Sequence, residues 1–117
     1  MPANMPQPIR GEVWLVSLDP TVGHEIKKTR PAVIVISNLY NQHNWVVVIV
    51  PLTSHDVAQY DQVLIEPPEG GVISTGVTLP DQIRAVDRGR LVKRLGTLGA
   101  DIMGRIDRSL RLVLSLR

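Results

Sequence analysis

The chain has 117 residues, 44% of them hydrophobic, a formal net charge of +2 and no cysteine. That length is typical of one domain with a sizeable core, and so small a charge does not by itself identify a polyanionic partner. The lack of cysteine excludes disulfides, thiolate metal sites and cysteine catalysis, and it suits the reducing cytoplasm.

No stretch resembles a signal peptide, and no apolar run approaches the ~20 residues that span a membrane. We therefore expect a cytoplasmic protein without a membrane partner. Residues 1–9 contain three prolines and no apolar pattern, which predicts a flexible N-terminal tail. Residues 10–117 are expected to form a single domain.

Three apolar segments dominate the first half of the chain. Glu12–Leu18 is a predicted strand that ends at the turn pair Asp19-Pro20. A polar, partly basic loop, Gly23–Pro31, then leads into two further predicted strands, Ala32–Ile36 and Trp45–Leu52, which are rich in valine and isoleucine.

The short connection between those two strands predicts an antiparallel hairpin. If Ala32 pairs near Val50, the same register sets Arg30 beside Leu52 and Thr53 at the open end of the hairpin. Proline lacks the N–H that a ladder needs, so the prolines next to Arg30 and Leu52 indicate that pairing stops there. The sequence thus brings a guanidinium and a hydroxyl together at one end of a sheet.

Shorter strands are predicted in the second half, at 63–66, 77–79, 81–86 and 91–95. Within 81–86, Ile83 and Ala85 alternate with Gln82 and Arg84, so we expect Gln82 and Arg84 to point outward. Five basic residues crowd this part of the chain: Arg84, Arg88, Arg90, Lys93 and Arg94.

The last predicted element is an amphipathic helix at about 100–116. Apolar residues recur there at three- and four-residue spacing, and the pairs Asp101–Arg105 and Asp107–Arg111 stand at i,i+4. Five to seven short strands followed by one such helix predict a mainly β (α+β) fold, a small bent sheet or open barrel with the helix packed against it.

Several catalytic motifs are absent from the sequence, including a Gly-rich phosphate loop, His-Glu-x-x-His and Gly-x-Ser-x-Gly. The three histidines are far apart, so no metal or other cofactor is expected. The remaining groups suit a phosphodiester: arginine donors, hydroxyls and proton carriers. Each also has a structural interpretation as a surface charge, a turn or a cap; the residues are Arg30, Arg84, Thr53, Ser54, Glu25, Asp81 and His24.

Four motifs, in this order and spacing, resemble the MazF/PemK (Kid-type) toxin endoribonucleases of type II toxin–antitoxin systems. They are Arg10–Trp14, Gly23–Glu25 with Arg30-Pro31, Pro51–Ser54 and Asp81–Arg84. The resemblance covers nearly the whole chain. It implies an SH3-like barrel with a C-terminal helix, a homodimer, a MazE-type antitoxin as partner, and metal-independent, sequence-specific cleavage of single-stranded RNA such as mRNA.

The resemblance also implies roles for individual residues. Arg30 and Thr53 match the family's catalytic arginine and threonine, and Glu25 and His24 match residues that some members use, here for proton transfer. Leu79 stands where some members have a second catalytic arginine, which places the chemistry on Arg30 and Thr53. The residues expected to bind RNA are Lys28, Ser54, Asp81, Gln82 and Arg84.

Two non-enzymatic alternatives share the predicted fold. CcdB-type topoisomerase poisons rely on a C-terminal Trp-Gly-Ile, whereas this chain ends Leu-Ser-Leu-Arg. A plain SH3-like module that binds RNA or a peptide is the other alternative, because fold does not fix function. The Arg-Pro and Pro-Leu-Thr-Ser motifs favour the nuclease.

Overall fold

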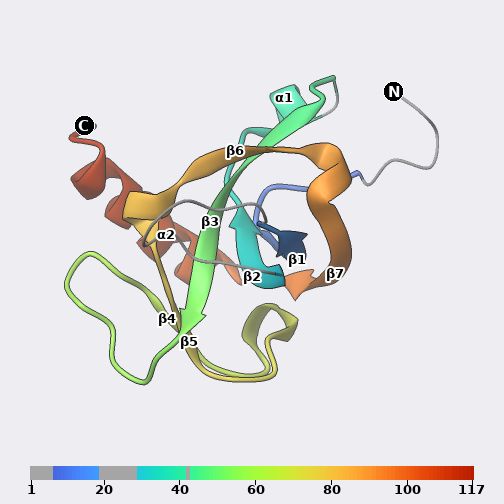
Figure 1. Ribbon diagram of the computed structural model, residues 1–117. Helices are drawn as coiled ribbons and strands as arrows, with labels where there is room; N and C mark the ends of the chain where they lie inside the picture. Colours follow the sequence, from blue (N-terminus) through green and yellow to red (C-terminus); the bar gives the residue numbers. More distant parts are fainter. Residues whose placement is uncertain (1–6, 19–28, 42) are drawn as a thin grey trace.

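The computed structural model describes residues 7–18, 29–41 and 43–117 (Figure 1). A seven-stranded antiparallel sheet makes up most of it, with three 3₁₀ turns and two α-helices. The elements are β1 (Glu12–Ser17), β2 (Thr29–Ile34), α1 (Asn38–Asn41), β3 (Val46–Ser54), β4 (Leu64–Ile65), η1 (Glu69–Gly71), β5 (Gly76–Thr78), η2 (Pro80–Gln82), β6 (Arg84–Asp87), η3 (Arg88–Arg90), β7 (Leu91–Thr97) and α2 (Ala100–Val113).

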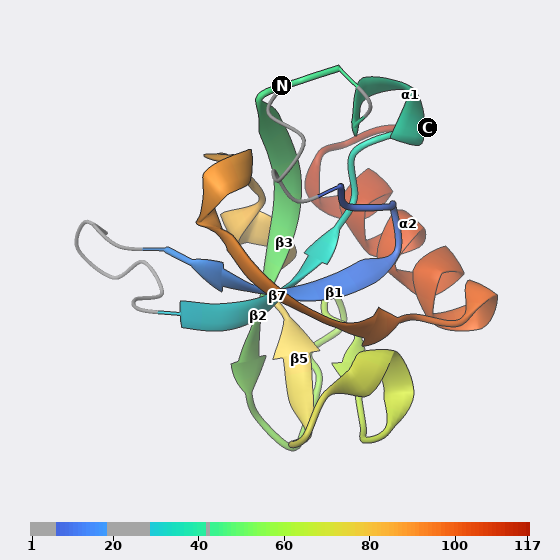
Figure 2. The same cartoon turned by 90° about the vertical axis from the view of Figure 1, so that its right-hand side faces the viewer.

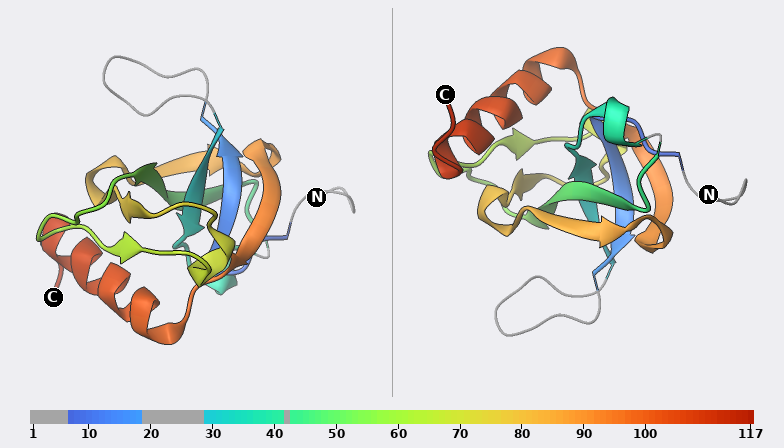
Figure 3. Two further views of the ribbon diagram at one scale, coloured as in Figure 1. Left: turned by 90° about the horizontal axis from the view of Figure 1, so that it is seen from below. Right: turned by 90° about the horizontal axis from the view of Figure 1, so that it is seen from above.

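Strand β3 is the centre of the sheet. One edge of β3 pairs with β2, and β1 and β7 follow, while its other edge is shared by β6 at Val46–Ile49 and by β5 at Leu52–Ser54. The sheet curls into a half-barrel with the C-terminal helix beside it (Figure 3). The predicted mainly β fold with one C-terminal helix is confirmed.

Pro51 lies where β3 changes partners along that shared edge. Its carbonyl accepts a hydrogen bond from the N–H of Leu79 at 2.9 Å, so the backbone of Pro51 points toward the gap between β5 and β6. A residue with an N–H would find no strand partner there, and proline removes that donor. Pro51, predicted to end the ladder between β2 and β3, therefore lies within β3, beside the gap between β5 and β6.

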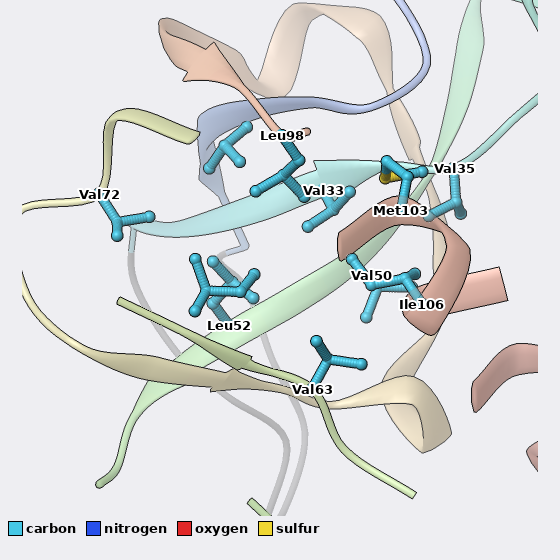
Figure 4. Close-up of a cluster of buried hydrophobic side chains, with 11 residues drawn as sticks. Val33, Val35, Val50, Leu52, Val63, Val72, Leu98, Met103 and Ile106 are labelled. Atoms are coloured by element: carbon cyan, nitrogen blue, oxygen red, sulfur yellow. The ribbon is translucent and has the colours of Figure 1, made fainter. Parts of the chain in front are cut away.

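Two apolar clusters occupy opposite faces of the sheet. Val33, Val50 and Leu52 point to one face, where Met103 and Ile106 of α2 cover them (Figure 4). Ala32, Ile34, Val47 and Ile49 point to the other face, where they pack with apolar residues of β1, β6 and β7. Burial on both faces explains why β3 is a continuous valine and isoleucine run rather than an alternating one.

The C-terminal helix is confirmed but is shorter than predicted, because it ends at Val113. Asp101 and Arg105 form the expected i,i+4 pair at 3.1 Å. Asp107 instead accepts a hydrogen bond from Arg10 at 2.6 Å, which ties the start of β1 to the helix. In the described part of the chain, no helix has the length and apolar character needed to span a bilayer.

The antiparallel pairing predicted for β2 and β3 is present, and their connection contains the short helix α1. The strand predicted at 81–86 is wrong, because η2 takes up Pro80–Gln82 before β6 begins. The inward and outward faces of β6 are also reversed: Val86 is buried opposite Val47, and Ala85 is exposed. Arg84 therefore shares a face with Val86, because side chains alternate along a strand.

Candidate active site

Strands β2 and β3 part at one end of the sheet. Their ladder reaches Ala32 opposite Pro51, one residue away from the predicted register. Beyond that pair, β2 stays with β1, with Arg30 opposite Val16, whereas β3 continues with β5, with Thr53 opposite Val77. Figure 2 shows the end of β3 running beside β5 and away from β1 and β2. The predicted open end of the hairpin is confirmed.

A cavity of about 290 Å³, here called the splay cavity, lies between the parted strands. Arg30 lines it from β2, and Thr53 and Ser54 line it from β3. Arg30 and Thr53 are half-buried and Ser54 is exposed, so polar groups stand at a rim open to solvent. The floor is apolar and consists of Leu15, Leu52, Ile65, Val72 and Leu95. This volume is near the lower end of the ~300–1,000 Å³ typical of ligand sites.

Gly76 lets β5 approach Thr53 closely. A Cβ at this position would lie 2.8 Å from the carbonyl oxygen of Thr53, closer than carbon and oxygen can pack. Gly76 pairs with Ser54, and the next residue, Val77, pairs with Thr53. Both hydroxyl residues at the rim are therefore held by a short ladder rather than by a loose loop.

Three of the predicted RNA-binding residues lie outside the splay cavity. Asp81 is exposed and Gln82 is half-buried in η2, which is held by the bond from Leu79 to Pro51. Arg84 is opposite Ile49, about 13 Å along β3 from Thr53 at ~3.3 Å per residue. The structure thus brings Arg30, Thr53 and Ser54 together and sets the other three further along the opposite edge of β3.

His24, Glu25 and Lys28 lie outside the described residues. Thr29, which follows Lys28 in the chain, lines the splay cavity beside Arg30. The interpretation of Glu25 or His24 as a proton carrier and of Lys28 as an RNA contact stays a prediction.

Sequence reasoning missed one wall of the splay cavity. Ile73, Ser74 and Thr75, in the connection between η1 and β5, line it opposite Arg30. Ile73 is 96% exposed although it is a large apolar residue. The available signal was the isoleucine next to Ser-Thr-Gly, a turn sequence in which an exposed aliphatic side chain is unusual.

The crowded basic segment does not form one positive surface. Arg88 has no exposed surface, and its guanidinium donates to the carbonyl of Asn44 from Nε at 3.0 Å and from Nη2 at 2.8 Å, and also to the carbonyl of Asn41. Burial lowers the pKa of the Arg88 guanidinium below its usual value. Arg94 is paired with the buried Glu12 at 2.5 Å.

Potential metal ligands do not gather in the described ranges: no group of three or more histidine, cysteine, aspartate or glutamate side chains converges there. The donors at the splay cavity are instead a guanidinium and several hydroxyls. A guanidinium stays charged and matches two oxygens of a phosphate, and a hydroxyl adds one further donor. The fold and site together define a small curled β-sheet protein whose cavity suits a phosphate-containing ligand.

Comparison with known proteins extends this description. The family model of the PemK-like, MazF-like toxins of type II toxin–antitoxin systems matches residues 9–114, and the chain belongs to this family. Endoribonuclease PemK of Escherichia coli is 40% identical over 99 residues, which cover 83% of this chain and 74% of PemK.

Two solved structures share the fold. MazF of Deinococcus radiodurans superposes with a TM-score of 0.80 at 27% identity, over 93% of this chain and 97% of that one. An endoribonuclease from a mycobacterial species, in complex with its cognate antitoxin, gives a TM-score of 0.78 at 27% identity, over 94% and 97% of the two chains. The relatives match the chain along nearly all of its length.

Proposed function

We propose that this chain is the toxin of a type II toxin–antitoxin pair and acts as an endoribonuclease that cleaves single-stranded RNA at the splay cavity. The observation that carries the proposal is the parting of β2 and β3, which sets Arg30 and Thr53 on the rim of one cavity. Family membership and the named endoribonuclease relatives support the activity and favour it over the two non-enzymatic alternatives.

The chemistry we propose uses the substrate's own nucleophile. The 2′-oxygen attacks the adjacent phosphorus, the bond from phosphorus to the 5′-oxygen breaks, and the products carry a 2′,3′-cyclic phosphate and a 5′-hydroxyl. One proton leaves the 2′-hydroxyl and another reaches the departing 5′-oxygen. The step needs no oxidant, reductant or added group, because every atom of the products comes from the RNA.

Arg30 stabilises the charge that builds on the phosphoryl oxygens. Its two directed N–H bonds are stronger in the transition state than in the ground state, and they act from a half-buried position where they are screened less than in water. The hydroxyl of Thr53 donates a hydrogen bond to a non-bridging oxygen. Glu25 or His24 accepts the proton of the 2′-hydroxyl, since an arginine is too basic to serve as a general base at neutral pH.

The substrate extends beyond the splay cavity. Lys28, Ser54, Asp81, Gln82 and Arg84 contact neighbouring nucleotides, and the spread of the last three along the opposite edge of β3 gives the RNA a longer track. A domain this small supplies only part of such a track, so two copies related by twofold symmetry complete it. Sedimentation of the active protein tests this, since full activity in a strict monomer would contradict it.

Regulation follows from the same site. A MazE-type antitoxin with an acidic, extended segment lies in the RNA groove and excludes the substrate, so its binding falls steeply with salt and competes with RNA. The chain works in the cytoplasm, where its mRNA substrate and antitoxin are found. The catalytic domain we propose spans residues 10–117, and the residue just before it, Ile9, donates its N–H to the Glu12 carboxylate at 2.7 Å.

The decisive experiment incubates the purified protein with a long RNA and identifies the new ends by sequencing. We expect cuts at one short motif, a 2′,3′-cyclic phosphate on each upstream fragment and a 5′-hydroxyl on each downstream fragment. The Arg30→Lys variant, purified in the same way, controls for contaminating nuclease. Cuts at the same motif and rate by that variant, or fragments with 5′-phosphates, would refute the proposed site and mechanism.

A further inference from the structure

A second cavity of about 370 Å³, here called the rear cavity, lies between α2 and the connection from β3 to β4. Leu64 lines the rear cavity, whereas Ile65 lines the splay cavity. Successive residues of a strand point to opposite faces, so β4 is a thin partition between the two cavities. Figure 3 shows β4 running alongside α2. A ligand in the rear cavity therefore touches the back of the candidate active site without entering it.

The walls of the rear cavity are fixed by hydrogen bonds. Ser109 of α2 is buried, and its hydroxyl donates to the carbonyl of Asp61 at 2.6 Å, which ties the connection to the helix. The N–H of Gln59 donates to the side-chain oxygen of Gln62 at 3.1 Å, which closes a turn in that connection. The rear cavity is thus a built feature rather than an accident of a loose loop.

The lining of the rear cavity combines two guanidiniums with aliphatic side chains. Arg105 and Arg108 come from successive turns of α2, and Leu64 and Leu112 line the same cavity. Arg105 contacts Asp101 at 3.1 Å in a pair whose side chains are 56% and 77% exposed, and such a pair contributes little and exchanges readily. The side chain of Arg108 makes no ion pair or hydrogen bond with any residue that the structure describes. The described lining contains no carboxylate.

We propose that the rear cavity is a docking site for an acidic polypeptide segment. Carboxylates of the segment pair with Arg105 and Arg108, because the guanidinium fork matches a carboxylate. An apolar side chain of the same segment fills the space between Leu64 and Leu112. Nothing in this pairing uses Arg30 or Thr53, so the proposal stands whether or not the splay cavity cleaves RNA.

A protein segment fits this surface better than a nucleic acid strand. Tyr60, which is 90% exposed, is the one aromatic ring in the described lining of the rear cavity. Stacking of successive bases needs a platform of several rings.

NMR of the methyl-labelled protein shows directly in which cavity an acidic peptide binds. The probe is a synthetic dodecapeptide with three Glu-Glu-Leu-Glu repeats, and its partner control has lysine in place of every glutamate. We expect the acidic peptide to shift the methyl resonances of Leu64 and Leu112 in a saturable way and to leave those of Leu15 and Leu52 in the splay cavity unchanged. Shifts confined to Leu15 and Leu52, equal shifts with the lysine peptide, or no saturable shift would overturn the proposal.

Arginine variants test the charge pairing. Arg105→Ala and Arg108→Ala should each weaken binding of the acidic peptide about fivefold, the upper range for an exposed ion pair. Arg111→Ala is the matched control, because Arg111 is exposed on the same helix but does not line the rear cavity. An equal loss of peptide binding in Arg111→Ala would show that net charge alone attracts the peptide, and it would refute the proposal. Displacement of the peptide by a single-stranded RNA oligonucleotide would show that RNA and peptide share one site, which would refute it as well. Unchanged melting temperatures establish that the variants are folded.

Discussion

Arg30 and Arg88 lie near opposite ends of β3, and they differ in burial and in their surroundings. Arg30 is half-buried at the end where β2 and β3 part, and it lines the splay cavity. Arg88 is fully buried near the start of β3, where its backbone N–H donates to the carbonyl of Trp45 at 2.8 Å and its side chain donates to the carbonyls of Asn41 and Asn44. At one end of β3 the arginine lines a cavity, and at the other end its guanidinium is enclosed by backbone carbonyls.

The difference arises from what the backbone does around each side chain. At the Arg88 end the chain folds over through α1, and the backbone carbonyls of Asn41 and Asn44 accept hydrogen bonds from the guanidinium. At the Arg30 end the strands separate, which leaves a hollow between them. A buried charge is tolerated only with such hydrogen bonds. Arg30 instead lines a cavity, so a ligand bound there lies within its reach.

The largest effect on RNA cleavage is expected from a substitution of Arg30, which tests whether this arginine is the catalytic one. Arg30→Lys keeps the charge but loses the two directed N–H bonds, so we expect single-turnover RNA cleavage to fall ~10²–10³-fold, or about 3–4 kcal/mol in the barrier. RNA affinity should mostly survive, and stability should stay within about 1 kcal/mol of wild type. Arg111→Lys, on the exposed face of α2, is the matched control and should cleave normally. A near wild-type rate in Arg30→Lys would place the catalytic arginine elsewhere.

The next effect is a loss of stability at Arg88. Arg88→Leu removes the donors to two backbone carbonyls in a buried setting, and each carbonyl left unsatisfied costs ~1–3 kcal/mol. We expect the free energy of unfolding, measured in urea, to fall by about 3 kcal/mol. Well below the melting temperature, the folded fraction should cleave RNA at the wild-type rate. A variant as stable as wild type but defective in cleavage would reverse the roles assigned to the two arginines.

The sequence predicted the Arg30 end well because its signals are local. Two β-branched runs, a short connection and two prolines predict both the hairpin and its open end, and the register was wrong by only one residue. The hydroxyls of Thr53 and Ser54 follow from that register. The third wall, at Ile73–Thr75, comes from a distant turn, and nothing in its own sequence indicates which cavity it lines.

The Arg88 end could not be predicted in the same way. Its side chain is satisfied by main-chain carbonyls far away in the sequence, and no residue type signals a carbonyl acceptor. The strand at 81–86 was assigned by alternation alone, but Ile83 and Val86 belong to different cores, one on each face of the sheet. Ile83 comes before β6 begins, so the alternation that it starts does not continue into the strand, and the side of Arg84 was reversed.

A smaller effect on the cleavage rate is expected at Thr53, which lines the splay cavity from β3. Thr53→Val keeps the shape and β-branching of the side chain and removes one hydroxyl donor to a charged phosphoryl oxygen, so we expect a loss of about 2 kcal/mol, or a roughly 30-fold lower cleavage rate. The pairing with Val77 should persist, which leaves stability unchanged. Thr97→Val, at an exposed position of β7, is the control. An Arg30→Lys/Thr53→Val double variant whose losses simply multiply would indicate that the two residues act independently rather than on one phosphate.

The smallest expected effect is that of a chelator on cleavage, and it tests whether a guanidinium is the source of positive charge at the splay cavity. A metal-dependent nuclease would need ligands that converge on the scissile phosphate, and such sites use carboxylates or histidines. The described lining of the splay cavity offers a guanidinium, hydroxyls and aliphatic side chains instead. We therefore expect the cleavage rate to be the same in excess EDTA as in Mg²⁺ once the ionic strength is matched, because Mg²⁺ alone would also screen the RNA. Activity that disappears in EDTA and returns with Mg²⁺ would assign the charge stabilisation to a metal ion, and Arg30 would then be reduced to a residue that positions the RNA.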